Sequence, residues 1–80
     1  MQKIIFSNHA RYQLLERGIT VQDVRAALAA PDKTVRQSAR RFQSVARINT
    51  RYALVVVYDR FLGRVEIVTA FKTSKIFKYL

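Results

Sequence analysis

Two polar clusters in this chain of 80 residues carry side chains that could move protons or hold a phosphate. The first surrounds the only histidine, His9, in the stretch FSNHARYQLLERGIT (residues 6–20). At about 100° per residue, a helix here would place three further polar side chains on or beside the stripe of His9: Gln13, Glu16 and Arg17. We therefore expect His9 at the surface, where an imidazole could act as a general acid or base. A solvated helix face with no chemical role is the alternative interpretation.

The second cluster closes the chain, in TAFKTSKIFKYL (residues 69–80). Hydroxyl and ammonium groups that lie near one another suit phosphate binding, and this segment supplies them from Thr69, Lys72, Thr73, Ser74, Lys75, Lys78 and Tyr79. Phe77 and Tyr79 could also stack on unpaired bases. In the alternative interpretation, Phe71, Ile76 and Phe77 attach the segment to the core and the lysines only face solvent.

Charge favours a polyanionic partner. Fifteen Lys and Arg against five Asp and Glu give a net charge of +10, and residues 33–58 contain six basic residues and no acid. Such a charge destabilises a small fold by self-repulsion, so we expect it to serve nucleic-acid binding, with RNA as the partner. A solvated basic surface that only keeps the chain soluble is the alternative interpretation. With no cysteine, one histidine and few acids, we expect no metal site and no cofactor. We expect no membrane association and a cytoplasmic location, because no run is long enough to span a bilayer and no signal-peptide pattern is present.

The elements that position these clusters can be read from caps and periodicity. Residues 3–6 are typical of a strand, and a helix over 8–17 would start at Ser7 or Asn8 and stop at Gly18. A second helix over 21–30 would start at Thr20, with Asp23 completing a capping box. After Pro31 the period changes to that of strands, in segments 33–38, 41–48, 51–59 and 64–72. The pattern predicts one α+β domain over residues 1–80: two N-terminal helices pack on one face of a roughly four-stranded antiparallel sheet, the other face is rich in arginine, and a short C-terminal tail follows.

Both ends of the chain resemble one known family. Residues 4–32 (IIFSNHARYQLLERGITVQDVRAALAAPD) are similar to the opening of the small domains called domain of unknown function 4258, where a strand leads into H-A-x-x-R-x-x-E-R-G-I. Residues 65–80 (VEIVTAFKTSKIFKYL) are similar to its closing strand and its tail T-A-[FY]-x-T-S-K-x-x-K-Y-L. The residues that match are His9, Ala10, Glu16, Arg17, Gly18 and Ile19 in the first motif and Thr69, Thr73, Ser74, Lys75, Lys78 and Tyr79 in the second.

That family resembles the RelE/ParE toxin superfamily and the wider ribonuclease group that includes barnase and the colicin tRNases. The resemblance implies two N-terminal helices against a four-stranded antiparallel sheet. It also implies a role as the toxin of a toxin–antitoxin pair. From the net charge of +10 we expect the partner to be an acidic antitoxin protein encoded nearby, which covers the arginine face or the tail. RelE-like members cut ribosome-bound mRNA whereas ParE-like members act on DNA gyrase, so the resemblance leaves the activity open.

Two hypotheses follow from the clusters and the resemblance together. In the first, the protein is a metal-independent endoribonuclease, since RNA carries its own nucleophile, the 2′-OH. His9 would be the general acid or base, Glu16 the alternative base, and Arg17 and Lys75 would stabilise the transition state. Thr73, Ser74 or Tyr79 would supply hydrogen bonds or a second proton.

In the second hypothesis, the protein is a non-catalytic module that binds nucleic acid or a protein target, and His9 contributes only a hydrogen bond. In both hypotheses we expect nucleic-acid contacts from six residues: Arg41, Arg47, Lys72, Ser74, Lys78 and Tyr79. The first hypothesis requires that His9 and the tail share one cleft, so the distance between them discriminates the two.

Overall fold

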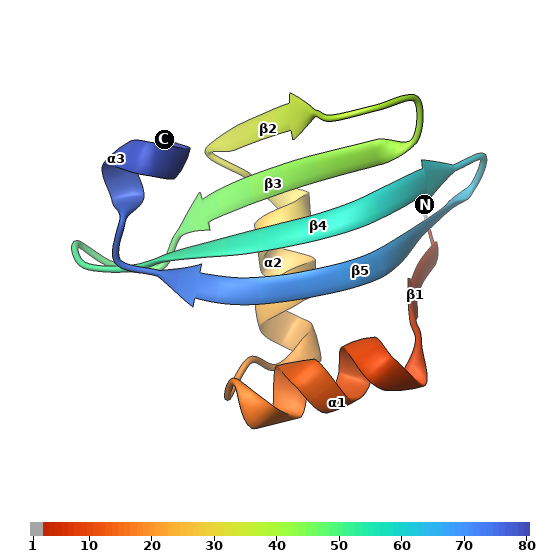
Figure 1. The fold of residues 1–80 in the computed structure, drawn as a ribbon, viewed down its shortest axis with the longest axis horizontal. Helices are drawn as coiled ribbons and strands as arrows, with labels where there is room; N and C mark the ends of the chain where they lie inside the picture. The colour runs from red at the N-terminus through yellow and green to blue at the C-terminus, as the bar shows by residue number, and fades with distance from the viewer. Residues whose placement is uncertain (1–2) are drawn as a thin grey trace.

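A computed structural model describes residues 3–80 and contains five strands and three helices in that range (Figure 1). In chain order these are β1 (Lys3–Phe6), α1 (Asn8–Glu16), α2 (Val21–Ala29), β2 (Lys33–Arg36), β3 (Arg41–Arg47), β4 (Ala53–Phe61), β5 (Arg64–Thr73) and α3 (Ile76–Tyr79). The two predicted N-terminal helices are confirmed to within one residue. The tail is not wholly irregular, because its last turn is the short helix α3.

Local side chains explain where the two long helices begin and end. The Ser7 hydroxyl accepts a hydrogen bond from the Ala10 N–H at 3.0 Å and caps α1. At the start of α2, Thr20 and Asp23 each accept a hydrogen bond from the other's backbone N–H, which completes a capping box. Gly18 follows the end of α1 at φ +66°, a left-handed conformation in which glycine avoids the steric cost of a Cβ.

The sheet has five strands rather than the roughly four that were predicted, in the order β1-β5-β4-β3-β2. The additional strand is β1, which pairs with β5 in parallel, with Lys3 opposite Arg64. The sheet is therefore not purely antiparallel, and that part of the prediction was wrong. A four-residue segment at one end of the chain shows no preference for a partner strand at the other end, so its pairing could not be read from the sequence.

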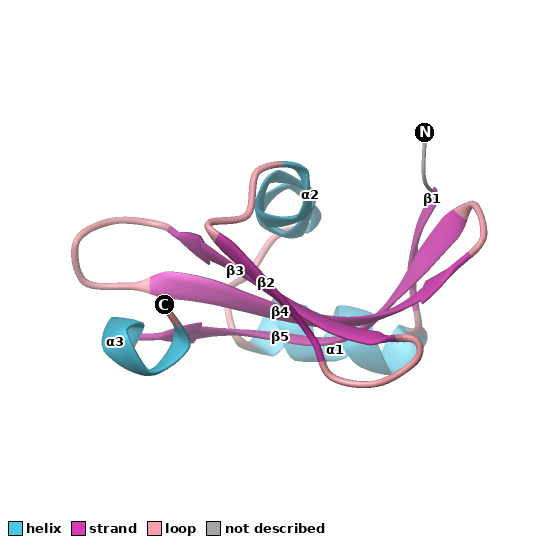
Figure 2. Ribbon diagram, turned by 90° about the horizontal axis from the view of Figure 1, so that it is seen from above, coloured by secondary structure: helices cyan, strands magenta, loops and turns pink. Residues whose placement is uncertain are grey.

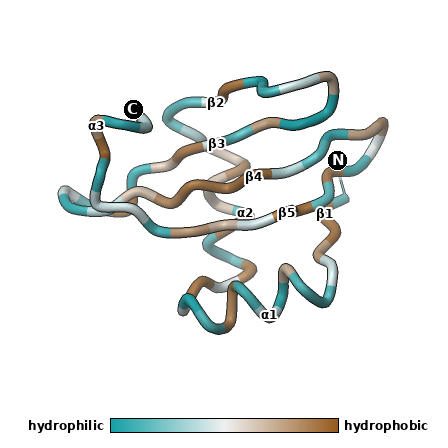
Figure 3. Tube along the Cα trace, in the orientation of Figure 1, coloured by the Kyte–Doolittle hydropathy of each residue, from teal (hydrophilic) through white to brown (hydrophobic). Residues whose placement is uncertain are grey.

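The main core lies between the helices and one face of the sheet. Buried residues of both helices, among them Ala10, Leu14 and Val24, form one cluster with residues of β4 and β5. Figures 1 and 2 show that α2 crosses β3 and β4, whereas α1 lies lengthwise along β5. Hydrophobic residues are concentrated along the central strand β4 (Figure 3), whose buried residues contribute to the clusters on both faces of the sheet.

The opposite face of the sheet holds a second, smaller cluster. Its buried residues are Val45, Ala53, Val55 and Ile76, and the partly buried Val57, Phe71 and Tyr79 pack against it. α3 thus covers part of this face, on the other side of the sheet from α2 (Figure 2). Because Val45 belongs to this cluster, alternation along β3 puts Arg41, Gln43 and Arg47 on the same face.

A bulge interrupts the pairing of β4 with β5. Val57 lies opposite Thr69 and Tyr58 lies opposite Ile67, so Val68 has no partner on β4. Ile67 and Ala70 both contribute to the core on the helix side, three positions apart, because the bulge shifts the alternation by one residue. Thr69 follows the bulge and contacts α1 through hydrogen bonds with Gln13 and Arg17.

Candidate functional site

The polar stripe of α1 is attached to the outer edge of β5. The Arg17 guanidinium donates from Nη1 to Thr69 Oγ1 at 3.0 Å and to the Ala70 carbonyl at 2.9 Å. Thr69 Oγ1 in turn donates to Gln13 Oε1 at 2.9 Å. β1 pairs with β5 only as far as Ile67, so Arg17 satisfies a carbonyl on an edge that no described strand covers. Arg17 thus joins the end of α1 to the middle of β5.

His9 and the tail lie on opposite sides of this contact. α1 starts beside β1 and runs in the same direction as β5, towards the end of the sheet that carries α3 (Figure 1). His9 precedes Arg17 by about 12 Å of helix, and Thr73 follows Thr69 by about 13 Å of strand. The separation of His9 from Thr73 is therefore on the order of 20 Å. His9 is exposed, as expected, and so is Glu16 on the last turn of α1. In this structure the imidazole and the tail cannot contact one phosphate.

The tail is ordered by its own contacts. Thr73 Oγ1 accepts a hydrogen bond from the Lys75 backbone N–H at 3.0 Å, which shapes the turn into α3 and leaves the Lys75 side chain exposed. The Tyr79 ring packs edge-on against Phe71, with centroids 5.9 Å apart, and the Lys78 ammonium lies 5.7 Å from the centre of the Tyr79 ring. Tyr79 is therefore partly buried against the sheet. Phe77, which is 99% exposed, is the aromatic residue of the tail that is free to stack on a base.

A groove lies where the loop between β3 and β4 (residues 48–52) approaches α3. Its volume is about 430 Å³, and we call it the tail groove; its lining residues are Arg47, Thr50, Arg51, Tyr52, Ser74, Ile76 and Phe77. Of the predicted contact residues, it brings together Arg47 and Ser74. Two guanidinium groups, three hydroxyls and an exposed ring suit a phosphate and an adjoining base.

Sequence reasoning did not assign Arg51 and Tyr52 to a site. The Asn49 side chain fixes their loop, because Asn49 Oδ1 accepts hydrogen bonds from the backbone N–H groups of Arg51 at 2.8 Å and Tyr52 at 2.9 Å. The signal that could have found them is the turn pair Asn49–Thr50 between two arginines, in RINTRY.

Two other predicted contact residues lie away from the tail groove. Lys72 lines another cleft, of about 310 Å³, with Asp23 and Asp32; Arg47 borders both this cleft and the tail groove. The hydrogen bonds from Thr20 lower the pKa of Asp23, and the nearby charge of Lys72 adds to the effect. The charge of Lys72 thus acts on the Asp23 carboxylate, and the two acids of this cleft would repel an RNA phosphate, so Lys72 is a poorer ligand for RNA than the sequence suggested.

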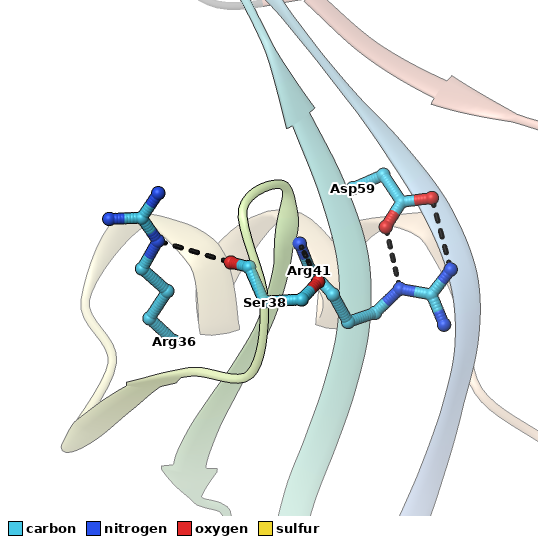
Figure 4. Close-up of polar contacts among 4 residues, drawn as sticks. All are labelled: Arg36, Ser38, Arg41 and Asp59. Carbon is cyan, nitrogen blue, oxygen red and sulfur yellow. Dashed lines mark hydrogen bonds and ion pairs between the residues drawn. The ribbon is translucent and has the colours of Figure 1, made fainter.

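Arg41 lies at the other end of β3 and forms an ion pair with Asp59, which is opposite it on the neighbouring strand β4. Its guanidinium donates to both carboxylate oxygens of Asp59, at 2.5 and 3.1 Å (Figure 4). This hydrogen bonding lowers the pKa of Asp59. Ser38 organises the adjoining turn, accepting from the Arg41 backbone N–H through its hydroxyl and from Arg36 Nε through its carbonyl. Arg41 is thus positioned by protein partners, far along β3 from Arg47.

The same end of the sheet carries four further arginines that sequence reasoning did not assign to a site. Two aromatic rings each lie beside two guanidinium groups at 4.3–5.8 Å from the ring centre: Arg36 and Arg60 beside Phe42, and Arg40 and Arg64 beside Phe61. Cation–π contacts hold these arginines in place.

No three His, Asp or Glu side chains in residues 3–80 lie close enough together to hold a metal ion. No helix in the same range is long and apolar enough to cross a membrane.

A protein family and a solved structure are each similar to nearly the whole chain. The family described as Domain of unknown function (DUF4258) matches residues 6–79. Curated proteins provide no match to the chain. Among solved structures, the 1.1 Å crystal structure of the Brucella abortus ribonuclease toxin BrnT is similar, with a TM-score of 0.68 over 94% of this chain and 100% of that chain. The two sequences are 16% identical, so the likeness concerns the fold.

Proposed function

Because the chain belongs to the DUF4258 family and shares its fold with a ribonuclease toxin, we propose that it is a toxin-type endoribonuclease that needs no metal ion. The sequence resembles the RelE/ParE superfamily, and the activity that we propose is that of its RelE-like members, which act on RNA. The tail groove is the observation that carries it.

The lining of the tail groove matches what RNA cleavage asks of a protein. The substrate brings its own nucleophile, so the protein must hold the phosphate, stabilise the charge that develops on it and assist the leaving group. Arg47 and Arg51 can pair with the phosphate oxygens, and Phe77 offers a face for the neighbouring base. Lys75 is exposed directly beside Ser74 and adds a further cation.

The bond changes are simple. The 2′-oxygen attacks the adjacent phosphorus, the bond from phosphorus to the 5′-oxygen breaks, and a 2′,3′-cyclic phosphate forms. We assign to the Tyr52 hydroxyl the proton that the departing 5′-oxygen takes up, since Tyr52 lines the groove. Water accepts the proton of the 2′-OH. In this proposal His9 takes no part in the reaction, and Arg17 acts by attaching α1 to β5.

The decisive experiment measures cleavage of a labelled single-stranded RNA in the presence of a metal chelator. We expect Arg51→Ala to lower the rate at least about tenfold, because a cation near the transition state is lost. His9→Ala should keep the parent rate. The matched control is Lys33→Ala, which removes one positive charge from an exposed position on β2 outside the groove. If His9→Ala loses activity while Arg51→Ala retains it, the assignment of the site is wrong.

A second candidate function is RNA binding without cleavage. It is favoured by the separation of His9 from the tail and by the groove lining, which among the described residues contains neither an imidazole nor a carboxylate to act as base. RNA that binds the parent chain and loses affinity with Arg51→Ala, but is never cut, would support this second candidate and contradict the first.

The proposal includes an acidic antitoxin as partner, encoded by a neighbouring gene. A partner that binds only the folded chain raises its melting temperature by mass action. Producing the chain with and without the protein encoded next to it tests this point. Equal yields and equal melting temperatures would argue against such a partner.

A further inference from the structure

A cleft of about 420 Å³ lies between the C-terminal half of α2 and the sheet, on the face opposite α3. We propose that this cleft, called here the α2 cleft, binds a phosphate monoester with an apolar body, of the class of the nucleoside monophosphates. It is lined by Ile4, Arg25, Leu28, Ala29, Pro31, Thr34, Ser44, Tyr58, Arg60 and Val65. The proposal does not depend on RNA cleavage, because the tail groove lies on the other side of the sheet.

A chain of three hydroxyls forms the floor of the α2 cleft. Thr34 Oγ1 and Ser44 Oγ are 3.0 Å apart, and Ser44 Oγ and Tyr58 Oη are 2.9 Å apart. Three hydroxyls carry three protons but share only two hydrogen bonds, so one O–H of the chain is left to donate outside it. Ser44 is 1% and Tyr58 7% exposed, whereas Thr34 is exposed, so the network runs from a buried end to a hydroxyl that can meet a ligand in the cleft.

Two arginines at the α2 cleft supply positive charge without a carboxylate. Arg60 is held 5.4 Å from the centre of the Phe42 ring, and Phe42 stacks on Tyr58 with centroids 5.9 Å apart, so the guanidinium is positioned next to the hydroxyl chain. Arg25 reaches the cleft from α2. The described residues that line the cleft include no Asp or Glu. In a chain of net charge +10, two cations around one cleft repel each other, and a bound anion would relieve that repulsion.

The remaining wall decides the kind of anion. Five of the lining residues are apolar: Ile4, Leu28, Ala29, Pro31 and Val65. An inorganic ion would leave this wall facing water, whereas a ligand with a planar or aliphatic body would cover it. The volume falls within the range of small-molecule sites. In the proposed complex, the phosphate contacts the two arginines and the free O–H, and a base or similar apolar body packs against the apolar wall. Each group of lining residues then contacts part of the ligand.

The test is calorimetric titration of the full chain with 5′-AMP, adenosine and inorganic phosphate at physiological ionic strength. We expect 5′-AMP to bind more tightly than either fragment. Arg25→Gln should weaken 5′-AMP binding about tenfold, because it removes a positive charge that faces the phosphate, and Tyr58→Phe should weaken it severalfold, because it breaks the hydroxyl network that orients the free O–H. The control Arg51→Gln alters the tail groove and should leave the affinity for 5′-AMP unchanged.

Three outcomes would overturn the proposal. These are no binding of 5′-AMP at millimolar concentration, equal affinity of the parent and Arg25→Gln, and equal affinity for 5′-AMP and inorganic phosphate. Arg25 is exposed on α2, so its variant should fold even if Tyr58→Phe does not. Because Arg51→Gln should impair RNA cleavage while 5′-AMP binding persists, failure of the proposed ribonuclease activity and failure of the α2 cleft can be told apart.

Discussion

Arg17 offers the sharpest test of how α1 is held to the sheet. Its guanidinium makes two hydrogen bonds to β5, one to Thr69 Oγ1 and one to the Ala70 carbonyl. A hydrogen bond to a charged group contributes roughly 1.5–3 kcal/mol when it is shielded from water. Arg17 is exposed and water can replace it at both acceptors, so we expect Arg17→Ala to lower the free energy of unfolding by only about 1–2 kcal/mol. In a domain of this size that corresponds to a drop in melting temperature of roughly 5–15 °C.

The measurement is thermal and urea unfolding followed by circular dichroism. Arg25→Ala is the matched control, because it removes an exposed arginine for which no hydrogen bond is seen within residues 3–80, and it should leave the melting temperature unchanged or slightly raised. A double-mutant cycle with Thr69→Ala isolates the contact, and the two substitutions should be less than additive. A parent-like melting temperature for Arg17→Ala would refute the reasoning. RNA cleavage by Arg17 variants must be compared below their melting temperatures, so that lost folding is not mistaken for lost catalysis.

Three further predictions concern the turn after α1, the ion pair of β3 with β4, and the charge of the chain. Gly18→Ala should reduce the free energy of unfolding by about 1 kcal/mol, because an L-residue is strained at φ +66°, and an unchanged urea midpoint would contradict this. Hydrogen bonding to Arg41 lowers the pKa of Asp59 below 3.8, so the stability from the pair is present above about pH 5 and is lost as the pH falls through the folded-state pKa. The melting temperature of the parent should therefore fall more steeply between pH 5 and pH 2 than that of Asp59→Asn, and parallel curves would argue against the pair. Affinity for single-stranded RNA should fall steeply as salt is raised, because bound cations release counterions from phosphates, and a flat response would exclude the electrostatic mechanism.

Local chemistry was sufficient to predict the helices. Ser7, Thr20 and Gly18 act on backbone groups within a few residues of themselves, so their effect is visible in the sequence. The pairing of β1 was not visible, because it depends on which edge of the finished sheet is free beside α1. The strand segments after Pro31 were found from their alternation, but the bulge at Val68 arises from the fit of β5 to β4 and leaves no local signal.

The candidate site, like the fold, could be predicted from the sequence only where local spacing determines it. That His9 would be exposed follows from helical spacing and holds in the structure. Whether His9 and Lys75 share one end of the sheet depends on the direction of α1 along β5, which spacing does not determine. Tyr79 was assigned to nucleic acid from its type, yet its ring packs on Phe71 because α3 folds back on the sheet. Its neighbour Phe77 takes the exposed position instead.

Because of its bulge, β5 has one position at which a residue could be deleted without turning the later side chains to the opposite face. Deleting one residue from a regularly paired strand turns every later side chain to the opposite face, which would move Ala70 out of the core and Phe71 into it. Val68 is the exception, since it has no partner on β4 and the residues on either side of it already occupy consecutive ladder positions. A chain without Val68 would keep Ile67 and Ala70 towards the helices and Phe71 towards α3. A length change at this one position of β5 would therefore alter its twist while preserving which residues face each side.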